Sequence, residues 1–422
     1  MKIFALVVFL LMYVLMVAWP KYRPLWSLGA AALFLLAGLL PLDGLASVIN
    51  WNVLMMIAGT MILVHAFIES QMPNLLADLL LEKSKNVLWV TILMSLFSGA
   101  ISALIDNVAT VLIVAPVGLA ICRKLGRNPV PMILSISVSS NLQGAATLVG
   151  DTTSIMLGDY AGMNFMSFFW MEGRPGIFFA VELGALATVP VMMLLFRGDR
   201  EPVRAGERAA VTDYLPTGML LLMVAALIAA SFLPEAPAIL NGAICCVLAL
   251  ASLLLRVMRE RSLSGAKDTL RHLDFETLGL LLGLFLVIGG LRQVGLIDDM
   301  AQGLVRFGGE NLFLLYTIIV WGSVLISAFV DNIPYVAAML PVLRSVTATL
   351  GMEPYLLYFG LLSGATLGGN ITPIGASANI TAVGLLRREG HAVSFRDFMR
   401  IGVPYTLTAV LVGYLFLWLF WA

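Results

Sequence analysis

The stretch ISALIDNV at residues 101–108 recurs in the second half of the chain as ISAFVDNI at residues 326–333. The two copies are 225 residues apart (331 minus 106), and each is followed by a Pro-Val pair. At the same offset GAATLVG (144–150) aligns with GNITPIG (369–375), so that Gly, Thr and Gly coincide. Two motifs held at one offset indicate that the chain is built from two related halves.

The composition places both halves in a lipid bilayer. The chain has 422 residues, of which 60% are apolar and 12% charged, and its 25 basic residues balance its 25 acidic ones. Soluble domains average about 45–50% apolar and about 25% charged, and nucleic-acid-binding chains carry a strong basic excess. The three cysteines show neither a disulfide framework nor zinc spacing. The sequence therefore predicts an all-α, multi-pass membrane protein with no nucleic-acid partner and no cofactor.

Apolar runs of about 20 residues predict ten membrane spans. They lie near 3–20, 26–42, 51–68, 130–160 (interrupted), 176–196, 215–233, 236–257, 275–292, 353–385 (interrupted) and 401–421. Two further stretches, 87–122 and 311–347, carry Asp-Asn at their centres and are predicted to be re-entrant hairpins built of half-length helices. The segments near 71–83 and 296–308 are short and polar, so we expect interfacial helices there.

The basic residues support this topology, because Lys and Arg accumulate in cytoplasmic loops. Alternating the sides through ten spans puts about 20 of the 25 on one side. The exceptions are Lys2, Arg174, Arg292, Arg306 and Arg344. This predicts an inner-membrane protein with both termini outside.

Five spans and one hairpin in each half imply that the second half is inverted relative to the first, because the number of crossings is odd. The predicted organisation is a first repeat over 1–196, a charged cytoplasmic linker over 197–214 and a second repeat over 215–422. Inverted repeats with paired interruptions are typical of secondary transporters. Helix breaks rich in Gly, Thr and Asn are tolerated at membrane depth only inside the protein or along a wet cavity.

The hairpin tips and the helix breaks supply the candidate binding residues. One cation site is expected between the first tip and the first break, and a pseudo-equivalent site between the second tip and the second break. The candidates are Asp106, Asn107, Thr147, Gly150, Asp151, Thr152, Asp331, Asn332, Thr372, Gly375, Ser377 and Asn379. Hard oxygen ligands suit sodium, which is placed at Asp106, Asn107 and Asp151.

The three intramembrane carboxylates have more than one interpretation. Asp106 and Asp331 each precede a half-helix and are either ion ligands, N-caps or both. Asp151 aligns with Ala376, so it is not part of the shared scaffold and is a candidate coupling group. His65, a lone histidine in an apolar span, is expected to be a packing residue.

The motifs over 102–110, 144–151, 331–334 and 368–379 resemble the arsenite-permease and sodium–proton antiporter group of the ion-transporter superfamily, which includes the melanosomal P protein. The resemblance extends over nearly the whole chain. It implies a homodimer in which a transport part, made of the hairpins and broken helices, slides as an elevator against a scaffold. Related dicarboxylate and citrate carriers have Ser-Asn-Thr at the tips, where this chain has Asp-Asn-Val and Asp-Asn-Ile. The carboxylates at the tips weaken the interpretation that the substrate is a carboxylate. After Asp151, many relatives have Pro-Pro-Asn where this chain has Thr152-Thr153-Ser154, so the site of the first half is expected to differ in substrate.

The resulting functional hypothesis is secondary transport of a small inorganic ion, with proton-coupled sodium antiport preferred. The preference rests on the expectation that no Lys or Arg lies at mid-membrane to neutralise an anion. Export of arsenite or another oxyanion and sodium-coupled carboxylate transport stay open as alternatives. A remote alternative is an intramembrane aspartyl protease with Asp106 and Asp331 as its dyad.

Overall fold

The computed structural model describes residues 1–41, 45–199, 201–202, 208–233, 236–309 and 311–422, which are almost entirely helical. The first half contains α1 (Lys2–Ala18), η1 (Pro20–Tyr22), α2 (Arg23–Leu36), α3 (Leu45–Val48), α4 (Trp51–Glu69), α5 (Met72–Lys83), α6 (Val87–Ser102), α7 (Asn107–Lys124), α8 (Val130–Gly144), α9 (Thr152–Tyr160), η3 (Met166–Phe168) and α10 (Ile177–Leu195). The second half contains α11 (Leu215–Ala230), α12 (Leu240–Glu260), α13 (Ser264–Arg271), α14 (Phe275–Gln293), α15 (Leu296–Gly308), α16 (Leu312–Ser327), α17 (Asn332–Leu350), α18 (Tyr355–Gly368), η4 (Gly369–Ile371), α19 (Ser377–Arg388) and α20 (Phe395–Trp421). A two-residue antiparallel ladder, β1 (Trp170–Met171) with β2 (Arg174–Pro175), precedes α10.

Seven helices within the described residues are long and apolar enough to cross a membrane: α4, α7, α10, α12, α14, α17 and α20. The pair α15 and α16 is bent by 117°, and counting it as one span raises the number to eight. The other predicted spans are shorter, since α1 has 17 residues, α2 has 14 and α11 has 16. Residue 42, the last of the span expected at 26–42, lies outside the described part of the chain.

Helices begin and end at the residues where the interrupted spans and the hairpin tips are expected, while re-entry of the hairpins into the membrane stays a prediction. The span expected at 130–160 is two short helices, α8 and α9, and the one expected at 353–385 is α18 and α19. The hairpins are the pairs α6–α7 and α16–α17. Their second arms have 18 and 19 residues, about 27 Å of helix, so they are longer than the half-length helices expected.

Helix boundaries recur between the two halves at the spacing of the sequence motifs. Helices α6, α7, α8 and α9 begin at residues 87, 107, 130 and 152, and α16 to α19 begin at 312, 332, 355 and 377. The pairing of helices recurs as well, because α6 packs on α8 as α16 packs on α18, and α4 packs on α12 as α14 packs on α2. Helix α10 packs against α20.

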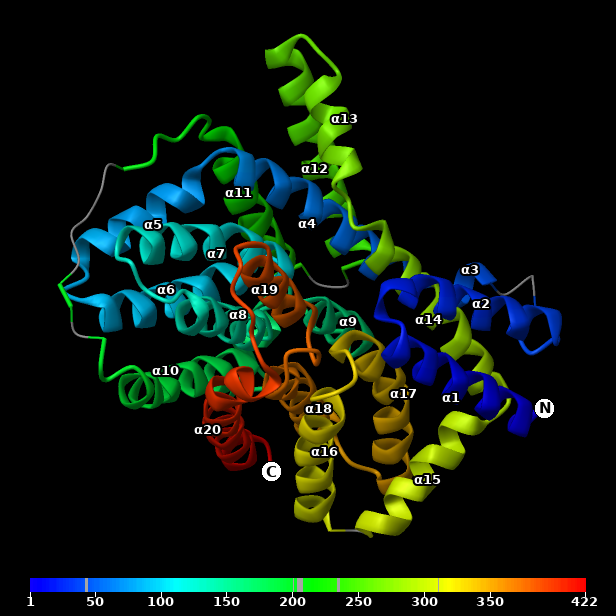
Figure 1. Ribbon diagram of the computed structural model, residues 1–422. Coiled ribbons are helices and arrows are strands. Elements are labelled where there is room, and N and C mark those ends of the chain that lie inside the picture. The colour runs from blue at the N-terminus through cyan, green and yellow to red at the C-terminus, as the bar shows by residue number, and fades with distance from the viewer. Residues whose placement is uncertain (42–44, 200, 203–207, 234–235, 310) are drawn as a thin grey trace.

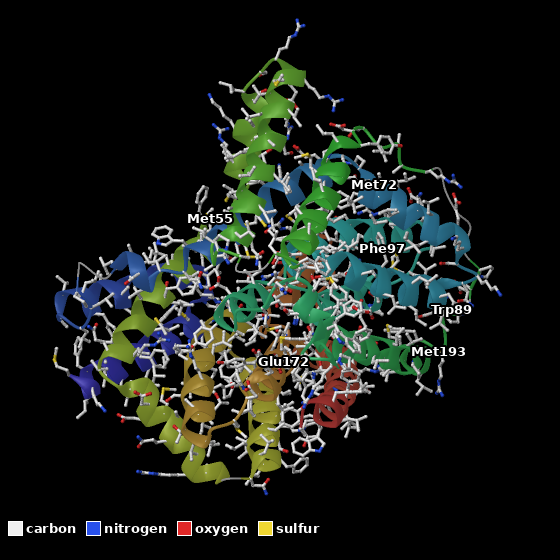
Figure 2. The ribbon with its side chains drawn as sticks, turned by 180° about the vertical axis from the view of Figure 1, so that it is seen from behind. Met55, Met72, Trp89, Phe97, Glu172 and Met193 are labelled. Carbon is white, nitrogen blue, oxygen red and sulfur yellow. The ribbon has the colours of Figure 1, made fainter. Side chains whose placement is uncertain are left out.

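Figure 1 shows two groups of helices with the broken helices between them. Helices α1, α2, α14 and α15 lie on one side, α5, α6, α7 and α10 lie on the other, and α13 projects with the end of α12 as an arm. Large apolar side chains cover the outside: Leu36 and Phe307 are 85% exposed and Leu419 is 75% exposed. Trp89 and Met193, also exposed, lie along one edge of the molecule in Figure 2. Such a surface is stable only against lipid or another apolar partner.

The described part of the linker between the halves is docked on the first half. Arg208 forms a bidentate ion pair with Glu82 of α5, and the backbone N–H of Thr212 donates a hydrogen bond to Ser70 O. Residues 200 and 203–207 of the linker predicted at 197–214 lie outside the described residues.

Candidate functional site

A cavity of about 220 Å³ lies at the hairpin tips. Six helices of the described chain begin at it, namely α2, α7, α9, α14, α17 and α19. Its polar lining consists of Arg23, Asp106, Asn107, Asp151, Thr152, Asp274, Glu276, Thr277, Asp331, Asn332 and Ser377. The exposed Asp274 and Glu276 form its rim, whereas Asp151 and Asp331 are 2% and 4% exposed. The cavity therefore combines five carboxylates, one guanidinium and the positive ends of six helix dipoles.

Both hairpin tips reach this one cavity, which differs from the two separate sites that we expected. The side chain of Asn332, at the second tip, lies 3.5 Å from Asp151 Oδ2, at the first helix break. The second tip thus contacts the first break, because the two halves interlock at the cavity. Seven of the twelve candidate residues line it: Asp106, Asn107, Asp151, Thr152, Asp331, Asn332 and Ser377.

The tip aspartates cap the helices that they precede. Asp106 Oδ2 accepts hydrogen bonds from Val108 N at 3.0 Å and Ala109 N at 3.1 Å. Asp331 Oδ1 accepts one from Ile333 N at 3.1 Å. These bonds satisfy backbone donors that the first turn of a helix leaves free.

Asp331 also forms an ion pair that the sequence did not predict. Arg23 Nη1, at the start of α2, lies 2.7 Å from Asp331 Oδ2, and the two side chains are 15% and 3% exposed. Ser377 Oγ donates to the same carboxylate oxygen at 3.0 Å. Arg23 lines the cavity, so a guanidinium lies where a substrate anion could meet it. The argument against an anionic substrate relied on the absence of such a cation and is therefore weaker.

Asp151 has a different environment from the other two aspartates. It precedes α9, but its side chain makes no cap. Thr153 Oγ1 donates to Asp151 Oδ2 at 2.6 Å, and Thr153 Oγ1 also lies 3.0 Å from Thr366 Oγ1 of α18. Within the described residues no Lys or Arg pairs with Asp151. Its charge is therefore balanced mainly by the positive end of α9.

A buried amide network ties the first tip to the crossing of α8 and α18. Asn107 Nδ2 donates to Asn141 Oδ1 at 2.8 Å. Asn141 Nδ2 in turn donates to Thr366 O at 2.7 Å and to Asn370 Oδ1 at 3.1 Å. Buried networks of this kind fix geometry because each unmet bond would be costly.

The remaining five candidates hold the helix breaks rather than line the cavity. Thr147 Oγ1 donates to Ala103 O, and Thr372 Oγ1 donates to Ala328 O, which are equivalent bonds from break to tip in the two halves. A Cβ at Gly150 would lie 2.5 Å from Ser102 O, and one at Gly375 would lie 2.7 Å from Ser327 O, so both breaks require glycine.

Asn379 also has a structural position. It is fully buried, and its Nδ2 donates to Gly369 O at 3.1 Å. Its Oδ1 accepts from Ser137 Oγ at 2.7 Å. The amide of Asn379 thus provides a hydrogen bond to a backbone carbonyl that has no helical partner at the second break. Such carbonyls need a partner where no water is available, as inside a membrane.

The sequence interpretation missed two groups that line the cavity, namely Arg23 and the pair Asp274 and Glu276 at the start of α14. It also missed Asn141, which lies in the buried network behind the first tip. Arg23 was assigned to a cytoplasmic loop because it follows the first apolar run. A signal was available for Asn141, which interrupts an apolar helix with the polar run Ser139-Ser140-Asn141.

A larger cavity of about 530 Å³ lies beside the first and shares helices α4, α9, α14 and α17 with it. Its lining is mainly apolar and includes Met156, Phe285 and Ala337. Its polar groups include Arg292, whose Nη2 donates to Tyr160 Oη at 3.4 Å. Successive turns of the same helices thus face two cavities.

Comparison with solved structures shows the fold. The chain superposes on the Alcanivorax borkumensis YdaH transporter with a TM-score of 0.57, at 16% identity and over 87% of this chain and 84% of that one. The Neisseria gonorrhoeae protein MtrF, from a class described as antimetabolite efflux pumps, gives a TM-score of 0.55 at 15% identity, over 87% and 80% of the two chains.

Relatives by sequence are membrane transporters. An uncharacterized transporter of Mycobacterium tuberculosis is 31% identical over 99% of both chains, and a 46 kDa membrane protein of Mycobacterium leprae is 30% identical over 99% of both. The human P protein is 24% identical over 93% of this chain and 56% of its own. The relationship to the P protein expected from the motifs is thereby confirmed.

The family described as "Citrate transporter" (CitMHS) matches residues 12–361 and 247–422, which together cover nearly the whole chain. Membership of a transporter family excludes the aspartyl protease hypothesis. The chain belongs to the citrate transporter family of the ion-transporter superfamily and is a multi-pass membrane transporter rather than an enzyme.

Proposed function

We propose that this protein is a secondary active ion transporter in which Asp151 is the coupling carboxylate, and that it exchanges sodium for protons. One observation carries the proposal: among the three intramembrane aspartates, Asp106 and Asp331 cap helices and Asp331 also pairs with Arg23, whereas Asp151 does neither. A nearly buried carboxylate without such partners needs a cation or a proton. It can therefore alternate between the two.

The surroundings of Asp151 supply the ligands that sodium requires. Oxygen atoms of Asp106, Asn107, Thr152 and Asn332 line the same cavity. Carboxylate, amide and hydroxyl oxygens suit hard cations. Binding of sodium and protonation of Asp151 exclude each other electrostatically, which is the condition for antiport.

Transport of a carboxylate such as citrate, coupled to sodium or protons, is a second candidate, and Arg23 is the observation that favours it. Helices α9 and α19 also begin at the cavity without a side-chain cap hydrogen bond, and the positive ends of their dipoles favour an anion there. The printed description of the family points in the same direction.

We further propose that the two halves are inverted repeats and that the hairpins and broken helices move as an elevator against a scaffold of the remaining helices. Several contacts of the described residues cross the proposed boundary, and two of them involve buried polar side chains next to the helix starts. These two are the ion pair of Arg23 with Asp331 and the 2.6 Å hydrogen bond from Asn52 Nδ2 of α4 to Asp159 Oδ1 of α9. Each transport cycle would break and re-form them.

The proposed setting is the inner membrane, with both termini outside, because this orientation places most basic residues in the cytoplasm. We propose a homodimer, for which α12 offers a surface. Val247, Leu250, Leu254 and Met258 form a stripe along α12 at helical spacing and are 58–73% exposed. Such a stripe suits lipid or the same helix of a second copy.

The test is a flux assay in proteoliposomes with a pH-sensitive dye inside. Adding sodium to wild-type vesicles should change the interior pH, and Asp151→Asn should abolish that change. Asp299→Asn, which alters an exposed carboxylate of α15 outside the cavity, is the matched control and should respond as wild type.

In a second set of samples, citrate or arsenite is added to the same proteoliposomes and its uptake is measured. A flat response to sodium combined with citrate uptake that requires Arg23 would replace antiport by the second candidate. Arsenite flux with a flat sodium response would assign oxyanion export. A wild-type response in Asp151→Asn would remove Asp151 from the coupling role.

A further inference from the structure

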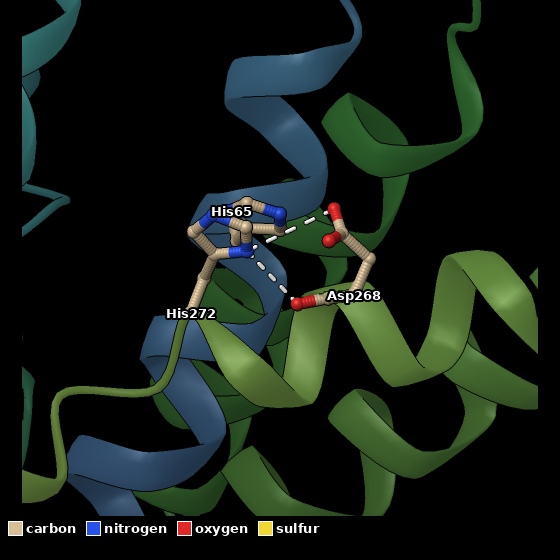
Figure 3. A group of neighbouring side chains, drawn as sticks. All are labelled: His65, Asp268 and His272. Atoms are coloured by element: carbon tan, nitrogen blue, oxygen red, sulfur yellow. Dashed lines mark hydrogen bonds and ion pairs between the residues drawn. The ribbon is translucent and has the colours of Figure 1, made fainter.

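Two histidines and two carboxylates meet where α4 contacts α13, and none of the four lines the transport cavity. His65 and Glu69 are four residues apart on α4, and Asp268 and His272 are four residues apart at the end of α13. Residues spaced by four lie on one face of a helix. These two faces contact each other, and Figure 3 shows His65, Asp268 and His272 converging from two elements distant in sequence. Glu69 approaches His65 from the same face of α4.

The geometry of the cluster is compact. The imidazole rings of His65 and His272 stack with centroids 4.4 Å apart and planes inclined by 16°. Candidate ligand atoms of His65, Asp268 and His272 all lie within 4.8 Å of one another. His65 Nε2 also lies 3.6 Å from Glu69 Oε1. Tetrahedral ligands of a metal at about 2.0–2.1 Å are roughly 3.3 Å apart, so side-chain rotations bring these atoms into range.

An unmet polar atom points to a ligand. His65 Nε2 is buried and has no hydrogen-bond partner within the described residues. A buried nitrogen left without a partner costs about 1–3 kcal/mol, which a bound cation would relieve. The ring of His65 therefore packs against His272, as expected of a packing residue, but leaves this nitrogen without a hydrogen bond.

The neighbouring groups orient the acidic partners. Arg256 forms ion pairs with Glu69 and Glu260 and donates to Thr269 Oγ1 at 3.0 Å. Its charge is thus offset by two carboxylates, and it holds Glu69 with one oxygen toward His65. His272 Nδ1 lies 2.9 Å from Asp268 O, and this contact fixes the ring. Outer contacts of this kind orient metal ligands in known sites.

We propose that His65, Asp268 and His272, with Glu69 as a fourth group, bind a divalent transition-metal cation of the zinc class. Two imidazoles with carboxylates suit Zn²⁺, Co²⁺ or Ni²⁺, whereas Mg²⁺ and Ca²⁺ prefer all-oxygen sites. The bound cation joins α13 to α4 and so fixes the projecting arm to the rest of the molecule. The site does not depend on which substrate is transported.

Binding is tested on the full-length protein in detergent, without a polyhistidine tag and after stripping with EDTA. Calorimetric titration with ZnCl₂ should give one ion per chain. Titration with Co²⁺ should give the visible absorption of a low-symmetry site with nitrogen ligands, and Mg²⁺ in excess should not compete.

The chain has three histidines, so His391 supplies a matched control. His65→Ala and His272→Ala should each weaken zinc binding by about tenfold or more, and Glu69→Gln by about 10- to 100-fold, whereas His391→Ala binds as wild type. His272 is exposed, so its variant is expected to fold, and size-exclusion elution without metal verifies this. Absence of saturable binding at one ion per chain, or unchanged affinity in His272→Ala, overturns the proposal.

Discussion

Arg23 Nη1 lies 2.7 Å from Asp331 Oδ2, which joins the second helix of the chain to the tip of the second hairpin, 308 residues later. The carboxylate is 3% exposed and the guanidinium 15%, so the pair is shielded from water. Removing one partner of such a pair leaves an uncompensated buried charge.

Arg23→Ala is therefore expected to lower the free energy of unfolding by about 3–5 kcal/mol. The measurement is thermal or denaturant unfolding of the purified protein in one detergent. The double variant with Asp331→Asn should recover much of the loss, because no charge is then left unpaired. A double variant no more stable than Arg23→Ala would mean that the ion pair is not the source of the loss.

Asp106 allows its capping role to be separated from its charge. Asparagine caps a helix about as well as aspartate, whereas alanine costs about 1 kcal/mol, so Asp106→Asn should retain stability and Asp106→Ala should lose about that amount. In the flux assay Asp106→Asn should lose the sodium response because the cavity loses a carboxylate. If the folded Asp106→Asn protein transports as wild type, Asp106 is a cap only.

Glycine is required where each helix break approaches its hairpin. Gly150→Ala and Gly375→Ala place a Cβ within 2.5–2.8 Å of backbone oxygens, so each should lower the free energy of unfolding by about 1–3 kcal/mol. Gly384→Ala, in α19, has open space around it and should be neutral or stabilising by about 0.5–1 kcal/mol. Equal unfolding midpoints for Gly150→Ala and Gly384→Ala would contradict the close approach.

The docking of the linker should depend on pH. Hydrogen bonds from Arg208 hold the pKa of Glu82 below its ordinary value of 4.5. A lowered pKa means that the contact is fully present above 4.5 and is lost as the pH falls through the lowered value. Hydrogen exchange of residues 208–212, corrected for the intrinsic pH effect, should accelerate over that range. Glu82→Gln should show the fast exchange already at neutral pH, and a pH-independent pattern in both proteins would refute the contact.

The sequence was most informative where one motif occurs twice. The offset of 225 residues located the helix boundaries and the polar groups at both breaks, because irregular backbone in a membrane protein needs specific residue types. Residue spacing also located Asp106 and Asp331 at helix starts, since an N-cap is a local feature.

Contacts between the halves could not be predicted in the same way. The contact between Asn332 and Asp151 joins the two expected sites in one cavity. This contact depends on how the two halves pack against each other. Arg23 begins a helix of 14 residues, and the packing of that helix against α14 brings Arg23 to the cavity. A hydropathy profile assigns such a residue to a loop, because it considers each segment separately and contains no information about packing between segments.

The bonds from Thr147 to Ala103 O and from Thr372 to Ala328 O have a mechanical consequence. Each helix break is hydrogen-bonded to the tip of its own hairpin, so in the proposed elevator movement tip and break would move together as one rigid body. An ion bound between them would keep its ligands during that movement, and the contacts that change would be those outside this rigid body. The rate of transport should then be set at Arg23 and Asn52, and the affinity for the ion at Asp151.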